Sequence, residues 1–144
     1  MEIRKATLDD FVELYKLGSS VPELKVTDEE FMSEADFKWH IKNPKGAFLL
    51  AEDNKKIVGF ACMSLRERNE DTYACLVYLA VSPDYRRSHI ASELYSKIEQ
   101  KAKEMGAEYI YGRMDANSEP IQKFMKRQDY RFGQACIWVD KKLR

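Results

Sequence analysis

The chain of 144 residues carries 24 Lys and Arg against 24 Asp and Glu, so its formal net charge is zero. A chain of this length typically forms one domain and buries enough surface to fold without a disulfide or a metal ion, so we predict a single domain over residues 1–144. The sequence lacks the basic excess of a general nucleic-acid or membrane-surface binder, and we predict neither partner.

The first elements in the chain are a short strand and two helical regions. Residues 2–6 alternate in polarity and predict a strand, and Thr7 with Asp10 three residues later begins a helix that Gly18 ends. A second helical region covers Thr27–Lys42 and is polar enough to be broken near Ser33–Asp36.

Three strands then follow with turns between them. The predicted strands are Ala47–Glu52, Lys56–Arg66 and Thr72–Val81, and Gly59 indicates a bulge or a close backbone approach in the second of them. The third strand is almost continuously apolar, which is typical of a central strand covered on both faces.

The second half alternates between helices and strands. An amphipathic helix is predicted over Ser88–Met105, closed by Gly106, and is followed by a strand over Glu108–Met114, a helix over Glu119–Gln128 and a final strand over Ala135–Lys142. This order predicts an α/β protein with a mixed sheet that is antiparallel early and parallel around the long helix.

Cysteine and histidine are too few and too scattered for a metal centre. The three cysteines show no CxxC spacing, and two histidines do not make a cluster, so we predict no disulfide framework and no metal. The N-terminal sequence lacks a signal-type apolar stretch, and no window approaches the ~20 apolar residues of a membrane span. We therefore expect a cytoplasmic protein.

The most informative segment joins the apolar strand to the long helix. The strand ends at Val81, a turn follows at Ser82-Pro83-Asp84, and Arg86 and Arg87 precede the helix. Free N–H groups and the positive end of the helix dipole meet at such a place, which suits a phosphate or pyrophosphate group. An ordinary surface turn with solvated arginines is the alternative.

Several motifs in this order resemble the GCN5-related N-acetyltransferase (GNAT) superfamily. Val81, Pro83, Arg86 and Ala91 match its pattern V-x-P-x-x-[QR]-x-x-G-x-[GA] in register. EIRKATLDDFVELYKL is similar to the family's first strand and helix, KIVGFACM to its third strand, and FMKRQDYR to its F-Y-x-K-x-G-F-x segment. The resemblance covers nearly the whole chain. It implies a GNAT-like mixed sheet of six to seven strands with about four helices, whose central parallel strands splay around the cofactor.

The resemblance implies acetyl-coenzyme A as the cofactor. Its pyrophosphate would rest on backbone amides of the turn, and its pantetheine arm would pair with the end of the apolar strand. The implied cofactor-binding residues are Leu79, Ala80, Val81, Arg86, Arg87, Ser88, His89, Ile90, Ala91, Asn117 and Phe124. For Asn117, and for Ser118 beside it, simple capping of the following helix is an equal alternative.

The implied activity is transfer of an acetyl group to a primary amine by direct attack of the amine. The amine would enter from the opposite side, over the N-terminal helices, and the backbone N–H near Leu79 would polarise the thioester carbonyl. The acceptor could be a protein N-terminus, a lysine or a small-molecule amine, and homodimers are common in this family. The alternatives are a coenzyme-A-binding sensor or interaction module with little catalysis, and an interaction domain without a ligand.

The chain departs from the family's pattern at three positions. His89 replaces the usual glycine of the loop, where any residue can adopt a helix-start φ; its imidazole would lie against a phosphate, obstruct the pocket or face solvent. Met125 stands where many members carry a proton-donating tyrosine, and Cys75 where several carry a glutamate.

Other side chains could replace the missing acid and base. The catalytic candidates, in addition to the backbone of Leu79, are Asp115 and Tyr111. Tyr109 and Tyr78 are further candidates, and for each of these four side chains a structural role is the alternative. Strand alternation places Tyr78 on the face opposite Cys75. Acidic residues near the second helical region could attract a cationic amine or form a solvated face: Asp28, Glu29, Glu30, Glu34 and Asp36. Trp138 in the final strand is expected in the core or at a dimer contact.

Overall fold

The computed structural model describes residues 1–25 and 31–144. Within these residues a five-stranded sheet has the order β1-β2-β3-β4-β5. All neighbouring strands are antiparallel except β4 and β5, which are parallel, as the sequence predicted for the strands around the long helix. The strands are β1 (Glu2–Lys5), β2 (Gly46–Asp53), β3 (Lys56–Arg68), β4 (Asp71–Val81) and β5 (Tyr109–Gly112).

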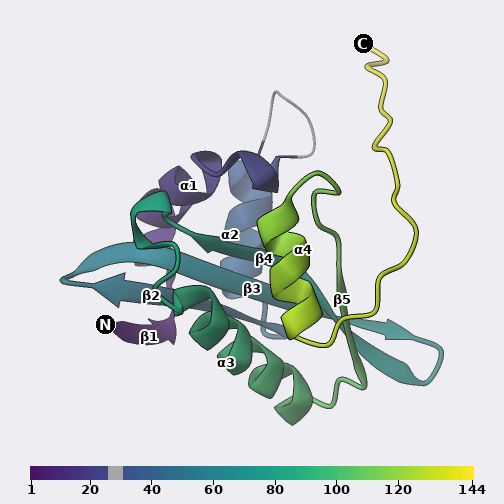
Figure 1. Cartoon of the computed structure of the whole chain (residues 1–144), viewed down its shortest axis with the longest axis horizontal. Coiled ribbons are helices and arrows are strands. Elements are labelled where there is room, and N and C mark those ends of the chain that lie inside the picture. The colour runs from purple at the N-terminus through teal and green to yellow at the C-terminus, as the bar shows by residue number, and fades with distance from the viewer. Residues whose placement is uncertain (26–30) are drawn as a thin grey trace.

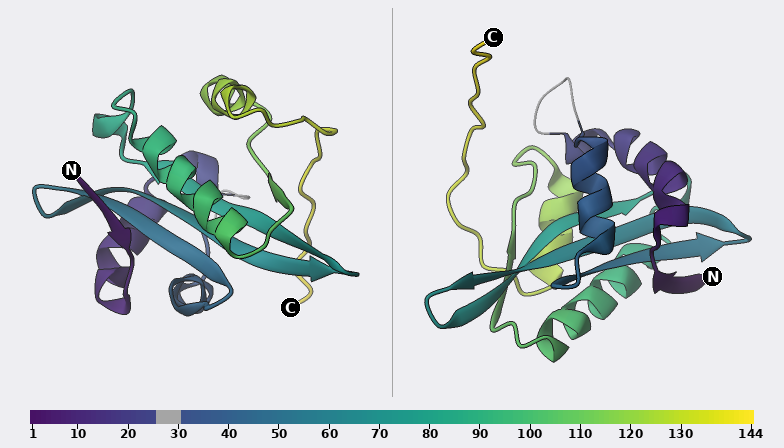
Figure 2. Two further views of the ribbon diagram at one scale, coloured as in Figure 1. Left: turned by 90° about the horizontal axis from the view of Figure 1, so that it is seen from below. Right: turned by 180° about the vertical axis from the view of Figure 1, so that it is seen from behind.

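Helices cover both faces of the sheet (Figures 1 and 2). The helices are α1 (Phe11–Ser19), α2 (Glu34–Lys42), α3 (Ile90–Glu104) and α4 (Glu119–Arg127). The first two lie on one face and the last two on the other, so the sheet separates two apolar cores. The core under α1 and α2 is centred on Phe37, which contacts the rings of Phe48 and Phe60. The core under α3 contains Leu94, Tyr95 and Ile98.

The first two helices differ from their predicted bounds. Thr7 and Asp10 form a capping box, but the box opens a short 3₁₀ turn (Leu8–Asp10) that leads into α1. Gly18 does not end α1, because it lies buried inside the helix, where an added Cβ would meet the ring of Phe31 at 2.6 Å. In the second region α2 begins only after Ser33, whose hydroxyl caps the backbone N–H of Asp36. The segment 26–30, including predicted helical residues and the acidic residues Asp28, Glu29 and Glu30, lies outside the described residues.

The predicted final strand over Ala135–Lys142 is wrong, and the described sheet therefore has five strands rather than six or seven. Residues 131–144 have no regular secondary structure and are exposed throughout. Ile137 and Val139 are 90% and 84% exposed. An alternating apolar segment becomes a strand only when it hydrogen-bonds to another strand and buries one face. This segment instead extends away from the sheet (Figure 1).

Candidate functional site

The two parallel strands separate halfway along β4. β5 pairs with β4 only from Tyr73 and Tyr109 to Leu76 and Gly112. β4 continues to Val81, and over its last five residues β3 is the only strand that pairs with it within the described sheet. The result is a V-shaped opening with one free strand edge between β4 and the segment after β5.

A β-bulge lies at the point where the strands separate. The register between β3 and β4 shifts so that Cys62 opposes Tyr78 and Met63 opposes Leu76, which leaves Val77 as the extra residue. A bulge bends its strand and increases the local twist. The bend of β4 at Val77 therefore directs its C-terminal end away from β5.

The backbone N–H of Leu79 points into the opening. Ser82, just after β4, donates its N–H to the carbonyl of Val58 on the β3 side at 2.8 Å. Successive N–H groups along a strand point to opposite sides, so Ala80 also faces β3, while Leu79 and Val81 face the free edge. A ligand chain lying in the opening could therefore accept hydrogen bonds from two strand N–H groups.

The turn from β4 into α3 presents further N–H groups. After a 3₁₀ turn (Pro83–Tyr85), Arg87 and His89 adopt positive φ values of 70° and 66°. Among the described residues, the N–H groups of Arg87, Ser88 and His89 meet no backbone acceptor. Together with the first N–H groups of α3, they form a concave group of donors suited to an anion.

His89 differs from its predicted backbone conformation. We expected a helix-start φ that any residue adopts, but α3 begins at Ile90, and His89 precedes it in the left-handed region. Glycine adopts this region without penalty, and histidine is among the residues enriched there. The side chain of His89 is exposed, so it does not fill the corner.

Packing beneath the turn holds α3 close to the sheet. Ile90 is only 3% exposed. A Cβ at Gly59 on β3 would lie 3.0 Å from the carbonyl oxygen of Ala80 and 3.2 Å from Leu94, so this glycine permits a close approach, as the sequence predicted. Arg86 points outward to a weak ion pair with Glu23 at 3.7 Å, and both side chains are well exposed.

Of the two predicted catalytic side chains, Tyr111 lies away from Leu79 along the sheet, and Asp115 takes part in a local turn. Tyr111 pairs in register with Cys75, which is four residues before Leu79, or about 13 Å along a strand. Asp115 is exposed, and its carboxylate accepts a hydrogen bond from the backbone N–H of Asn117 at 2.8 Å. This bond closes a local turn, which is the structural role that the sequence analysis left open for Asp115.

Tyr78 lies on a different face from the predicted one. The bulge at Val77 interrupts the alternation, so Tyr78, opposite Cys62, and Cys75, opposite Ser64, lie on the same face. This is the face covered by α1 and α2, where the ring of Phe31 lies 5.1 Å from that of Tyr78. Burial, with the nearby Cys62 and Asp36, raises the pKa of Tyr78 to about 12, so its hydroxyl stays protonated at neutral pH.

The helix after β5 packs on α3 through residues of the family motif. Phe124 and Met125 are nearly buried, and Phe124 lies edge-on to Tyr95 with ring centres 5.9 Å apart. Met125 accepts backbone hydrogen bonds from Gln128 and Tyr130 through its carbonyl. The side chain of Met125 therefore belongs to the core, and that of Asn117, before the helix, is exposed.

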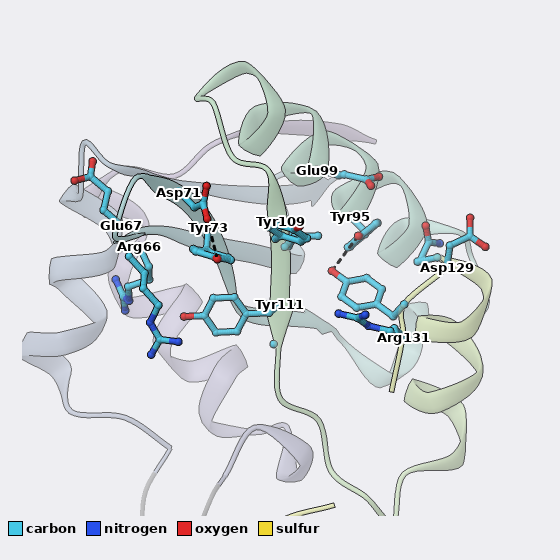
Figure 3. A pocket seen from close by; sticks show the side chains of 15 residues that line it. Arg66, Glu67, Asp71, Tyr73, Tyr95, Glu99, Tyr109, Tyr111, Asp129 and Arg131 are labelled. Atoms are coloured by element: carbon cyan, nitrogen blue, oxygen red, sulfur yellow. Dashed lines mark hydrogen bonds between the residues drawn. The ribbon is translucent and has the colours of Figure 1, made fainter. Parts of the chain in front are cut away.

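A second concave region surrounds β5. This cavity of about 1200 Å³ is lined by Tyr73, Tyr109 and Tyr111 on the sheet and by Tyr95 and Tyr130 beyond it (Figure 3). None of the residues from Arg86 to Ala91 lines it. The cavity around β5 and the turn before α3 thus have different lining residues.

The fold and the opening define a class of protein: a mixed α/β sheet whose central parallel strands part beside a helix N-terminus. The sequence matches the acetyltransferase (GNAT) family over residues 8–130, and the chain belongs to this family of enzymes. The resemblance read from the motifs is confirmed.

Individual relatives agree with this assignment. The chain is 26% identical to "Acetyltransferase SG1711" of Sodalis glossinidius and 27% identical to "Acetyltransferase ECA0875" of Pectobacterium atrosepticum, in each case over 99% of this chain and 96% of the relative. A transcriptional regulator from Bacillus halodurans has a similar structure, with a TM-score of 0.84 at 18% identity, covering 97% of this chain and 99% of its own.

The aminoglycoside N-acetyltransferase AAC(6')-Iy in complex with CoA also has this fold. It gives a TM-score of 0.78 at 16% identity and covers 98% of this chain and 99% of its own. The GNAT-like fold class is therefore confirmed, with a sheet of five strands in the described residues. None of the helices in the described residues has the length and apolar character of a membrane span.

Proposed function

We propose that this protein transfers the acetyl group of acetyl-coenzyme A to the nitrogen of a primary amine. The observation that carries the proposal is the free edge of β4 from Val77 to Val81, which leads directly into the N–H groups before α3. A bound thioester supplies an acetyl group that a neutral amine can attack. The new C–N bond forms as the C–S bond breaks, and one amine proton is lost as the thiolate gains one.

The turn has the donors that a pyrophosphate needs. The N–H groups from Arg87 to Ala91 supply hydrogen bonds without side-chain rearrangement, and Arg86 and Arg87 add positive charge beside them. The exposed side chain of His89 leaves this corner open. Leu79 and Val81 would hold the pantetheine arm through the backbone, while Ala80 between them keeps their strand paired to β3. Asn117 and Phe124 would lie on the other side of the opening, where the buried Phe124 would act by holding α4.

Leu79 has a second role in this proposal. Its N–H points into the opening and would donate to the carbonyl oxygen of the thioester, where negative charge develops during attack. The donor is fixed by the pairing of β4 with β3, so it needs no reorganisation during the reaction.

Tyr78 is our candidate for the proton donor in place of Met125. It follows Val77 at the bulge, adjoins Leu79, and carries a proton throughout the neutral range, as its pKa of about 12 requires. A general acid contributes typically 10²–10⁴-fold to the rate. Tyr78→Phe should therefore lower kcat by about 10²-fold while the affinity for coenzyme A stays the same. An unchanged kcat would remove Tyr78 from this role.

The acceptor would approach on the face of α1 and α2. Glu34 and Asp36 in the first turn of α2 are exposed, and Asp36 influences the pKa of Tyr78. Carboxylates near this entrance favour a cationic amine.

Three cysteines without a disulfide, one of them exposed, suit the reducing cytoplasm, where we place the reaction.

An acceptor screen followed by thiol release tests the function. The panel should contain a polyamine, an aminoglycoside, a lysine-containing peptide and peptides with different N-terminal residues. We expect thiol release above background with at least one amine, and mass spectrometry should show its acetylated product.

The second candidate, a coenzyme-A sensor with little catalysis, is favoured by the buried Met125, which cannot donate a proton. Binding of acetyl-coenzyme A by calorimetry without acetyl transfer to any amine would support it. Absence of binding at millimolar ligand would contradict both candidates.

A further inference from the structure

The sheet face that carries α1 and α2 is covered over only part of its width. α2 packs on β2 and α1 on β3, and Figure 2 shows that neither helix extends over β5. On β5, the side chains of Tyr109 and Tyr111 are 57% and 44% exposed. Tyrosine is enriched at binding surfaces, because its ring is apolar and its hydroxyl can bond to water or to a ligand.

Strand pairing places three tyrosines together on this uncovered part of the face. Tyr73 pairs with Tyr109, and Cys75 pairs with Tyr111. Paired residues of neighbouring strands project from the same face, and Cys75 lies on the face of α1 and α2. The rings of Tyr73 and Tyr109 stack, with centroids 5.4 Å apart and 20° between their planes. Tyr73, Tyr109 and Tyr111 thus form an aromatic surface, which we call the tyrosine floor.

Two exposed arginines of β3 border the tyrosine floor. Arg66 opposes Tyr73, and Arg68 projects from the same face two residues later. Figure 3 shows Arg66 beside Tyr73 and Tyr111, on the same side of β5. Asp71 opposes Arg68 in the register, but within the described residues no carboxylate forms an ion pair with either arginine. Both guanidinium groups are therefore available to an anion.

The charges along this face have opposite signs at its two ends. Glu34 and Asp36 lie in the first turn of α2, beside the proposed entrance for the amine. Arg66 and Arg68 lie at the other end, near Tyr111, where their charges oppose the rise that burial causes in its pKa. A protonated amine is attracted to the first end and a carboxylate to the second. An acceptor that carries both groups therefore binds in one direction.

The length of the face sets the size of the acceptor. Leu79, which we assign to the thioester, is four residues from Cys75 and six residues from Tyr73 along β4. At about 3.3 Å per residue, these separations are about 13 and about 20 Å. A free amino acid is too short to span them, whereas an extended peptide covers them with about four to six residues.

We propose that the acceptor is a polypeptide whose amine reaches Leu79 while an acidic side chain about four to six residues away binds Arg66 and Arg68. This inference rests on the proposed acetyl transfer and adds the chemical class of its substrate. The tyrosine floor packs against the apolar groups of the peptide, and the carboxylate accepts charge-assisted hydrogen bonds from the guanidinium groups. The amine belongs to the N-terminus or to a lysine, and these two sources share the same acidic segment.

Acceptor peptides that differ only in charge test the proposal. Each pair has one sequence with either glutamate or glutamine at the fourth to sixth positions from the amine. One pair has a free N-terminus as its only amine, and a second pair has a blocked N-terminus and one lysine. With the full-length protein, thiol release should give a kcat/KM about tenfold higher for the glutamate peptide at low salt, in at least one pair. The advantage should shrink near 0.15 M salt, because exposed charges are screened.

Reversing one charge on the protein identifies the contact. Arg66→Glu should remove the preference for glutamate and should raise kcat/KM for a peptide with arginine at the same positions, relative to wild type. Arg131→Glu is the matched control, because Arg131 is also exposed, lines the same cavity and lies on the other side of β5 (Figure 3). It should keep the preference for glutamate. Circular dichroism confirms that both variants fold.

The outcomes separate this inference from the acetyl transfer on which it rests. Equal kcat/KM for glutamate and glutamine peptides, or acetylation of small amines but of no peptide, would overturn the acidic acceptor and leave the transfer standing. Where no amine is acetylated, the transfer itself fails, and binding of the labelled glutamate peptide, followed by fluorescence anisotropy, decides. Binding that Arg66→Glu abolishes and Arg131→Glu preserves would support the acidic-peptide surface. Absence of binding to the wild-type protein would overturn it.

Discussion

A negative charge placed in the first turn of α3 should have opposite effects on folding and on coenzyme binding. Ser92 and Ser96 are both exposed and lie four residues apart, so they share one face of α3, and only Ser92 lies in its first turn. Ser92→Glu places a carboxylate near the N–H groups that we assign to the pyrophosphate. Ser96→Glu makes the same change about 6 Å further along the helix axis.

The size of the effect follows from Coulomb's law. A carboxylate about 6 Å from a phosphate in water costs about 0.7 kcal/mol, so two phosphates cost about 1.4 kcal/mol, a tenfold loss of affinity. Near 0.15 M salt the screening length is about 8 Å, and the loss should shrink to about threefold. The same carboxylate interacts favourably with the dipole of α3 and should raise the free energy of unfolding by about 0.3–1 kcal/mol.

Calorimetric titration with coenzyme A at low and physiological salt measures the affinity, and urea unfolding measures the stability. We expect Ser92→Glu to bind about tenfold more weakly at low salt, and Ser96→Glu, about 6 Å further from the phosphates, only about threefold more weakly. Equal affinities of the two variants at low salt would show that the anion does not bind at the N-terminus of α3.

Three further substitutions test the packing and the charges around the site. Gly59→Ala should cost about 1–3 kcal/mol of stability in thermal unfolding, because its Cβ would lie 3.0 Å from the carbonyl of Ala80; an unchanged midpoint would contradict the close approach. His89→Gly should raise the free energy of unfolding by about 0.5 kcal/mol, as glycine relieves the left-handed backbone but adds entropy to the unfolded chain, and coenzyme binding should not change if main-chain groups hold the anion. The hydrogen bonds of Arg4 lower the pKa of Asp10 to about 2. Asp10→Asn should therefore cost about 1 kcal/mol at pH 7, and this difference from wild type should disappear as the pH falls from about 4 through about 2; a difference that stays constant with pH would exclude the charge as its cause.

Local signals in the sequence predicted most of the elements. Gly106, with φ of 89°, closes α3 as expected, and the strands before and after the turn at Asp53-Asn54-Lys55 pair as a hairpin. These signals are local, because a positive φ or a tight turn depends on the one or two residues that adopt it. The motif around Val81 and Arg86 also identified the family correctly.

The errors concern features that two segments create together. Nothing in the apolar run of β4 marks Val77 as a bulge, because the extra residue is defined only by its pairing with β3. The wrong face for Tyr78 follows from that omission. Ala135–Lys142 has the alternation of a strand, but alternation specifies a buried face and does not supply the partner that buries it.

The bulge at Val77 links the two halves of the proposed site. It bends β4 away from β5, which exposes the N–H groups of Leu79 and Val81, and it also turns Tyr78 to the face of α1 and α2. If β4 alternated regularly through Val77, Tyr78 would lie on the side of α3, away from the face where we expect the amine. The opening for the coenzyme and the position of the proposed acid therefore have one structural origin, and a change in the pairing at Val77 would alter both together.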